Sequence, residues 1–148
     1  MKKLSAILGL MIFTLFSQNS FAKCEVTLTG NDQMQFDLKK IEVPGSCKKF
    51  KINLKHSGKL TKQVMGHNVV ISKTEDMTEI TQKAMAVGIK GDYVPKDSKV
   101  LAASKLVGGG EHTTLSVDIG KFKKGEKYTF FCSFPGHYAL MKGDFLIK

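Results

Sequence analysis

The sequence predicts an all-β fold, an antiparallel sandwich of Greek-key type. Three observations support this fold class. Short segments alternate apolar and polar residues, which is typical of strands with one buried face. Turn-forming pairs, such as Pro44-Gly45 and Lys124-Gly125, separate these segments at short intervals. A single segment has helical spacing instead, so an architecture of many short strands is favoured.

Residues 1–22 are predicted to be a secretory signal peptide. Two lysines precede an apolar run over residues 4–16, and small residues, Ser20 and Ala22, suit a cleavage site. An apolar run of this length falls well short of the roughly 20 residues that a membrane-spanning helix needs. We therefore expect cleavage after Ala22 and one mature domain over residues 23–148.

The predicted strands follow in chain order. Apolar residues alternate with polar ones in residues 23–30, 49–55 and 114–120, as expected for half-buried strands. Residues 67–72 and 128–132 are almost continuously apolar, which favours fully buried strands, and residues 143–148 close the chain.

One helix is predicted within a long excursion between strands. Four apolar residues recur at helical spacing on one stripe: Met77, Ile80, Ala84 and Val87. Asp76 is expected to cap the start, with Glu79 three residues later, and Gly88 to end the helix. We interpret the stripe as a packing surface.

The net charge of +10 at pH 7 falls to +8 when the two signal-peptide lysines are removed. A basic chain can bind nucleic acid, an anionic membrane surface or an acidic protein. The lysines are spread along the sequence, and no tract combines them with the stacking aromatics of single-strand binders. We expect no nucleic-acid partner and, after signal cleavage, no membrane partner.

Export affects how the three cysteines are interpreted. In an oxidising compartment two of the three should pair. Pairing Cys24 with Cys47 closes a loop of about two dozen residues, worth roughly 3 kcal/mol. Cys132 is then a free thiol, which is an oxidation liability unless it is buried or bound to metal. Metal binding is the simpler explanation.

Cys132 lies in a loop that also carries His137 and Met141, so a thiol, an imidazole and a thioether are close in sequence. One thiolate and two imidazoles in a plane, with a distant thioether on the axis, suit both Cu(I) and Cu(II). The loop lacks a second imidazole. His67, at the entry to a buried strand, is preferred as the second nitrogen ligand.

The same residue types also occur in other kinds of site. His56 and His112 lie beside turns, where a solvated histidine is ordinary. Zinc also binds thiolate and imidazole, but a thioether is a poor zinc ligand, and ligand softness favours copper. A cysteine hydrolase would need an oxyanion hole, for which no motif is present, and a copper oxidase would need an open ligand position. We therefore do not expect an enzyme.

The sequence resembles a known family. The segments "GHNVV" and "YTFFCSFPGHYALMKG", the cysteine pair and the export signal together resemble azurins, the bacterial type-I blue copper proteins of the cupredoxin fold. The resemblance spans residues 23–148. It implies an eight-stranded Greek-key cupredoxin sandwich with one helical flap, and a periplasmic electron carrier with one type-I copper ion.

The resemblance also implies roles for individual residues. Copper is expected between His67, Cys132 and His137, with two weak axial ligands, the Met141 thioether and the Gly66 carbonyl.

Further residues are expected to support these ligands. Asn68 is expected to tie the two ligand loops together, and the Phe134 amide to approach the cysteine sulfur. His56 corresponds to a second, non-ligating histidine. Many azurins carry a buried tryptophan where this chain has Val69, and the chain has no tryptophan.

An apolar patch for partner docking is implied around His137. Its expected members are Met34, Leu60, Met65, Met85, Pro135, Gly136 and Leu140. Such a patch suits brief redox encounters, and nearby lysines favour acidic partner faces. The expected partners are periplasmic redox proteins of the cytochrome c, nitrite reductase or peroxidase type, and the expected state is a monomer. Copper storage or delivery is the alternative function.

Overall fold

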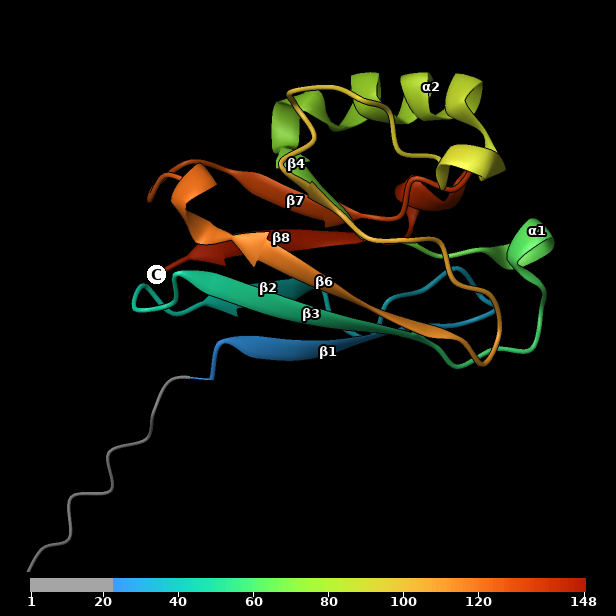
Figure 1. The fold of residues 1–148 in the computed structure, drawn as a ribbon, viewed down its shortest axis with the longest axis horizontal. Helices are drawn as coiled ribbons and strands as arrows, with labels where there is room; N and C mark the ends of the chain where they lie inside the picture. Colours follow the sequence, from blue (N-terminus) through green and yellow to red (C-terminus); the bar gives the residue numbers. More distant parts are fainter. Residues whose placement is uncertain (1–22) are drawn as a thin grey trace, which may run out of the picture.

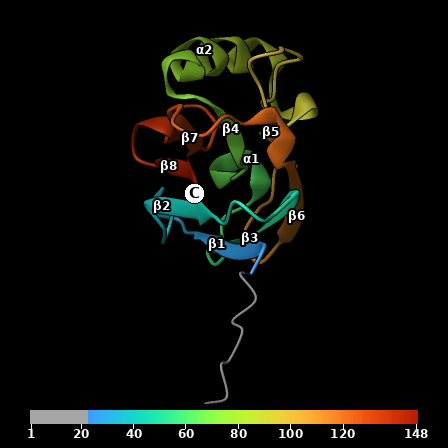
Figure 2. The same ribbon diagram turned by 90° about the vertical axis from the view of Figure 1, so that its left-hand side faces the viewer.

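Two β-sheets pack face to face in the computed structural model, which describes residues 23–148. The predicted signal peptide, residues 1–22, lies outside the described residues. The strands are β1 (Glu25–Gly30), β2 (Lys40–Val43), β3 (Lys49–His56), β4 (Val70–Lys73), β5 (Ala102–Ala103), β6 (His112–Asp118), β7 (Tyr128–Phe131) and β8 (Lys142–Ile147). One sheet has the order β1-β3-β6 and the other β2-β8-β7-β4-β5, so the all-β prediction is confirmed (Figure 1, Figure 2).

The sandwich is not wholly antiparallel, which corrects the prediction. β1 pairs in parallel with β3, and β2 pairs in parallel with β8. Consecutive strands β1 and β2 belong to different sheets, so β3 reaches β1 through a crossover rather than a hairpin. The other strand pairs are antiparallel.

All six predicted strand segments contain a strand, and the alternation places their apolar residues inside. In β3, for example, Phe50, Ile52 and Leu54 are buried, while the lysines of the strand are exposed and Asn53 is half-buried. Two strands escaped prediction. β2 has only four residues and β5 only two, too short for a clear period.

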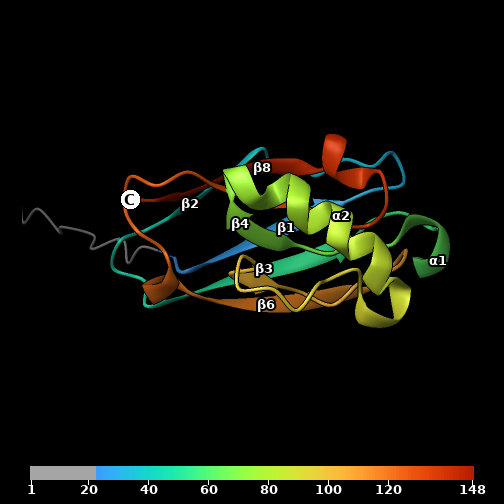
Figure 3. The same cartoon turned by 90° about the horizontal axis from the view of Figure 1, so that it is seen from above.

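The helices are α1 (Lys62–Met65) and α2 (Met77–Val87), with 3-10 turns η1 (Thr74–Asp76), η2 (Ile89–Gly91), η3 (Ile119–Lys121) and η4 (His137–Ala139). α2 lies over the five-stranded sheet (Figure 3), where Ile80 packs with Val70 of β4 and Phe131 of β7. The predicted helix and its end at Gly88, which has φ +67°, are confirmed. No helix within residues 23–148 is long and apolar enough to cross a membrane.

Two details of the helix prediction are wrong. Val87 is 37% exposed, while Thr81 is buried in its place beside Ile80. Asp76 makes no side-chain cap, because η1 runs directly into α2 and gives Asp76 helical backbone angles. Its carboxylate instead pairs with the ammonium of Lys99 at 3.1 Å.

The predicted disulfide is present between Cys24 and Cys47, with a sequence separation of 23 residues. It ties the chain just before β1 to the chain just before β3, at the start of their parallel pairing. Cys132 is a free, buried thiol.

Removing this disulfide is expected to destabilise the domain. The double substitution Cys24→Ala and Cys47→Ala should lower the free energy of unfolding by about 3 kcal/mol, because the unfolded chain regains the entropy of the open loop. Urea unfolding of the metal-free protein measures it, since bound metal would add its own stabilisation. A loss below about 1 kcal/mol would contradict the expectation that the disulfide stabilises the folded domain by restricting the unfolded chain.

Candidate metal centre

The pairing of β4 with β7 brings the central and C-terminal candidate ligands to the same end of the sandwich. Val70 pairs with Phe131 in this antiparallel ladder. His67 precedes β4 by a few residues and Cys132 follows β7 directly, so both lie beyond the same end of the ladder.

The loop after β7 then folds back on itself. Gly136 has φ +79°, a left-handed conformation that glycine adopts without steric cost, and the 3-10 turn η4 follows. The amide of Met141 donates to the His137 carbonyl (2.8 Å), and the amide of Cys132 donates to the Met141 carbonyl (3.0 Å). The chain therefore doubles back and returns Met141 beside Cys132.

Three donor atoms converge in the interior. His67, Cys132 and His137 each offer a ligand atom within 4.8 Å of the others, and all three are buried. The Cys132 Sγ lies 3.6 Å from His137 Nδ1 and 3.8 Å from the Gly66 carbonyl oxygen. The structure thus brings together the three residues predicted as the main ligands.

The hydrogen bonds of His67 leave one nitrogen for a cation. His67 Nε2 lies 2.8 Å from the Asn31 carbonyl oxygen, which can only accept, so Nε2 carries the proton. Nδ1 then presents its lone pair 3.0 Å from the Gly66 carbonyl oxygen. Two lone pairs facing one another beside a buried sulfur suit a metal ion, and the sulfur favours a soft one.

The predicted axial groups lie beside this cluster. Met141 is fully buried, and a Cβ on Gly30 would meet the Met141 methyl group at 3.3 Å and His67 Cδ2 at 2.7 Å. Gly66 has ordinary backbone angles. Its backbone angles therefore do not require glycine. Crowding from α1 does, because a Cβ at this position would lie 2.5 Å from the Lys62 carbonyl oxygen.

Asn68 connects three segments around the site. Its Oδ1 accepts from the Ser133 amide (2.9 Å), and its Nδ2 donates to the Ser133 Oγ (2.8 Å) and to the Asp92 carbonyl (2.7 Å). Ser133 in turn donates to the Tyr93 carbonyl at 2.7 Å. The backbone at Asp92 and Tyr93 is left-handed, with φ of 57° and 54°. Sequence reasoning missed Ser133, whose only signal was its place after Cys132.

Burial controls the protonation of the donors. Desolvation raises the pKa of the Cys132 thiol to about 11, although backbone amides of Asn68 and Phe134 donate to its sulfur and oppose the rise. Desolvation also lowers the pKa of His137 to about 4, helped by the nearby imidazoles of His67 and His56. The pKa of His67 is lowered, again chiefly by burial. Without metal at pH 7, the site holds a neutral thiol and two neutral imidazoles.

His56 is not the solvated residue that its place beside a turn predicted. It is 2% exposed, and its ring stacks on His67 with centroids 4.2 Å apart. Its Nε2 lies 2.8 Å from the Met65 carbonyl oxygen, and its Nδ1 accepts from the Gly58 amide at 3.0 Å. Because both ring nitrogens are occupied, His56 supports the His67 ring and has no free donor atom. His112 is exposed, as expected.

The expected members of the apolar patch differ in exposure. Its most exposed large members are Met85 (58%), Leu140 (54%) and Leu60 (40%), and Gly136 is also exposed. The remaining members are half-buried: Met34, Met65 and Pro135. Val64 on α1, which was not among the expected members, is 60% exposed. His137 itself is only 3% exposed, and its ring lies against those of Phe134 (centroids 4.5 Å apart) and His67 (5.2 Å).

The chain is similar to known copper proteins over most of its length. Residues 22–148 match the family described as copper binding proteins of the plastocyanin/azurin family. Azurin of Bordetella pertussis is 50% identical over 137 residues, covering 91% of each chain. Azurin of Pseudomonas aeruginosa (PAO1) is 51% identical over 128 residues, covering 86% of each chain. The solved structure of azurin iso-2 from Methylomonas sp. strain J superposes with a TM-score of 0.82 at 37% identity, covering 86% of this chain and 99% of that one.

Copper uptake should release one proton near neutral pH. The thiol, with a pKa near 11, must lose its proton to bind the metal, whereas both imidazoles are already neutral. Apparent copper affinity should therefore rise about tenfold per pH unit between about pH 6 and 8. Competition with a chelator of known affinity measures it. Affinity that does not change with pH would mean that the thiol is already ionised.

Removing the Asn68 side chain should loosen the site. In Asn68→Ala the buried Ser133 amide and the Asp92 carbonyl lose their partners, so the unfolding free energy of metal-free protein should fall by about 2–3 kcal/mol. Thr114→Ala is the matched control, because it removes only the exposed hydrogen bond to Asn53 and should cost less than about 1 kcal/mol. Equal losses in the two variants would contradict this role.

Proposed function

The chain belongs to the plastocyanin/azurin family of copper-binding proteins, and on that premise we propose that it is a periplasmic carrier of single electrons. The observation that supports this most is the convergence of two imidazoles and one thiol in a buried position. The bound ion would supply one-electron chemistry by cycling between Cu(II) and Cu(I).

We assign the ligands as follows. His67 through Nδ1, Cys132 as thiolate and His137 through Nδ1 would hold the ion most strongly. The Met141 thioether and the Gly66 carbonyl oxygen would bind it weakly. The burial of Met141 and the 3.8 Å separation of the Gly66 oxygen from the sulfur support this arrangement.

The surrounding hydrogen bonds keep the donors in place. Asn31 orients the His67 ring, and Asn68 and Ser133 fix the backbone that carries Cys132. A site whose protein ligands are held this firmly changes little when an electron arrives or leaves, which favours rapid transfer. Every donor is a buried protein group, and this supports a carrier over an enzyme with an open substrate position.

Partners are proposed to dock at the apolar patch that is expected around the loop of His137. An uncharged surface of this kind suits brief encounters with periplasmic cytochromes, nitrite reductases or peroxidases, with the protein acting as a monomer. Lys39 lies at its edge and donates to the Leu140 carbonyl at 3.2 Å. This lysine supports a partner with acidic groups around its own docking surface. Copper storage or delivery remains the alternative, and spectroscopy separates the two.

Reconstitution with Cu(II) should give an intense blue thiolate-to-copper charge-transfer band. Cys132→Ser should abolish this band, because the thiolate that donates the charge is gone. Visible absorption and circular dichroism are measured together, so that loss of colour can be separated from loss of fold. A colourless Cu(II) complex of the folded parent protein would favour storage or zinc binding instead.

A charge on the apolar patch should slow electron exchange. Leu140→Lys places an ammonium group where a partner must approach closely, so the second-order rate of reduction by a cytochrome c should fall about tenfold or more at low ionic strength. Stopped-flow absorption of the copper band measures the rate. Ser116→Lys is the matched control, because it adds the same charge on the exposed face of β6. Similar slowing by both variants would argue against docking at the patch.

A further inference from the structure

Six lysines gather at the end of the sandwich opposite the metal centre. They come from two segments far apart in sequence, and we call them the basic pole: Lys48, Lys49, Lys121, Lys123, Lys124 and Lys127. The Ile119 amide donates to the Lys48 carbonyl at 3.1 Å, and the backbone of Lys49 lies opposite that of Asp118 in the β3–β6 ladder. The two segments are therefore neighbours. In Figure 1 this end lies at the left, beside the C-terminus, and α1 lies at the right.

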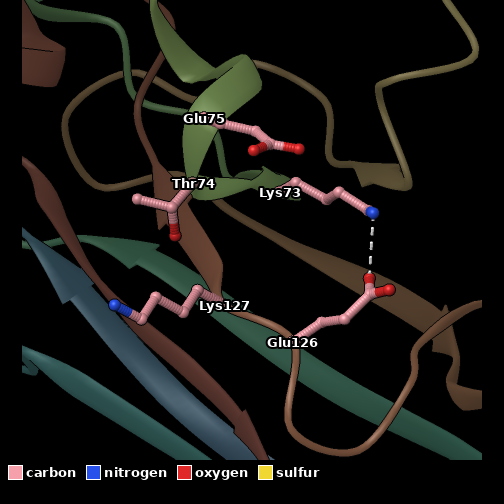
Figure 4. A pocket seen from close by; sticks show the side chains of 5 residues that line it. All are labelled: Lys73, Thr74, Glu75, Glu126 and Lys127. Atoms are coloured by element: carbon pink, nitrogen blue, oxygen red, sulfur yellow. Dashed lines mark ion pairs between the residues drawn. The ribbon is translucent and has the colours of Figure 1, made fainter.

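The charge of the basic pole is largely uncompensated. Within residues 23–148, none of its six lysines forms an ion pair. The nearby carboxylates are fewer than the six lysines. Glu126 is paired with Lys73 at 3.1 Å. Asp118 lies opposite Lys49 in the ladder and keeps its charge, because its hydrogen bond from the Gly120 amide (3.0 Å) does not neutralise it. Figure 4 shows the Lys127 side chain pointing away from the Lys73–Glu126 pair. Lys127 and Glu126 line a shallow surface pocket together with Lys73, Thr74 and Glu75, and Glu75 is exposed there.

The basic pole also lacks apolar contact surface. The exposed large apolar side chains of the described residues are Leu60, Val64, Met85, Val87 and Leu140, and none belongs to the pole segments. Its aromatic neighbours, Phe122 and Tyr128, are 8% and 2% exposed. Protein interfaces usually contain an apolar core, and single-stranded nucleic acid requires exposed aromatic rings for stacking. An anionic lipid surface attracts lysines through charge alone.

We propose that the basic pole is an electrostatic docking surface for an anionic phospholipid membrane. Contact through this end directs the metal centre and its apolar patch away from the lipid, where both stay accessible to partners. No membrane partner was expected from the sequence, where the lysines are spread along the chain and residues 48–49 lie far from residues 121–127. Only the fold shows that their charges act together.

Binding to vesicles tests the proposal and does not depend on copper. The parent protein should sediment with vesicles of phosphatidylglycerol and phosphatidylcholine at low salt, and should stay in solution with pure phosphatidylcholine. Each lysine near such a surface contributes about fivefold to partitioning, so the triple variant Lys121→Gln, Lys123→Gln and Lys124→Gln should bind about 100-fold more weakly.

A second triple variant controls for net charge. Lys55→Gln, Lys90→Gln and Lys96→Gln remove the same charge from exposed lysines outside the pole that form no ion pair, and partitioning should stay within about fivefold of the parent. Circular dichroism checks that both variants are folded. The proposal is overturned if the parent does not bind anionic vesicles, or if both variants lose affinity equally. It is also overturned if soluble polyglutamate or duplex DNA binds the parent more tightly than vesicles of equal charge concentration.

Discussion

The antiparallel register of β4 against β7 is the constraint on which the metal centre depends. Because Val70 pairs with Phe131, His67 and Cys132 extend from the same end of one ladder although 65 positions separate them in sequence. The Asn68–Ser133 hydrogen bonds continue this connection beyond the strands, where no ladder bonds are left to do so. A slip of one residue in the ladder would turn the side chains of one strand to the opposite face and separate the donors.

Burial determines the charge state of the three donor side chains. It keeps the thiol protonated and both imidazoles neutral in the metal-free protein, so the fold does not have to bury an uncompensated charge. A bound cation changes this balance, because a thiolate beside a metal ion is no longer an isolated buried charge. The stack of His56 on His67 and the bond from His67 to the Asn31 carbonyl hold the ring in one orientation before any metal arrives.

Much of this arrangement could be predicted from sequence, and the failures have physical causes. The periods of β3 and α2 are long enough to identify, and the C-terminal loop carries its ligand types in a short stretch. β2 and β5 are too short to show a period. The burial of His56 and the role of Ser133 arise from contacts between distant segments, which a local pattern does not contain. The same holds for the basic pole, since its two segments meet only through β3 and β6.

The central claim is that the fold itself brings the donors together around one copper ion. Anomalous diffraction at the copper absorption edge, from crystals of the copper-loaded protein, tests it most directly. The account predicts a single strong peak among His67 Nδ1, Cys132 Sγ and His137 Nδ1, with the strands and ligand loop positioned as in the metal-free protein. A peak elsewhere, such as beside the exposed His112, or donor atoms that lie far apart without metal, would contradict it.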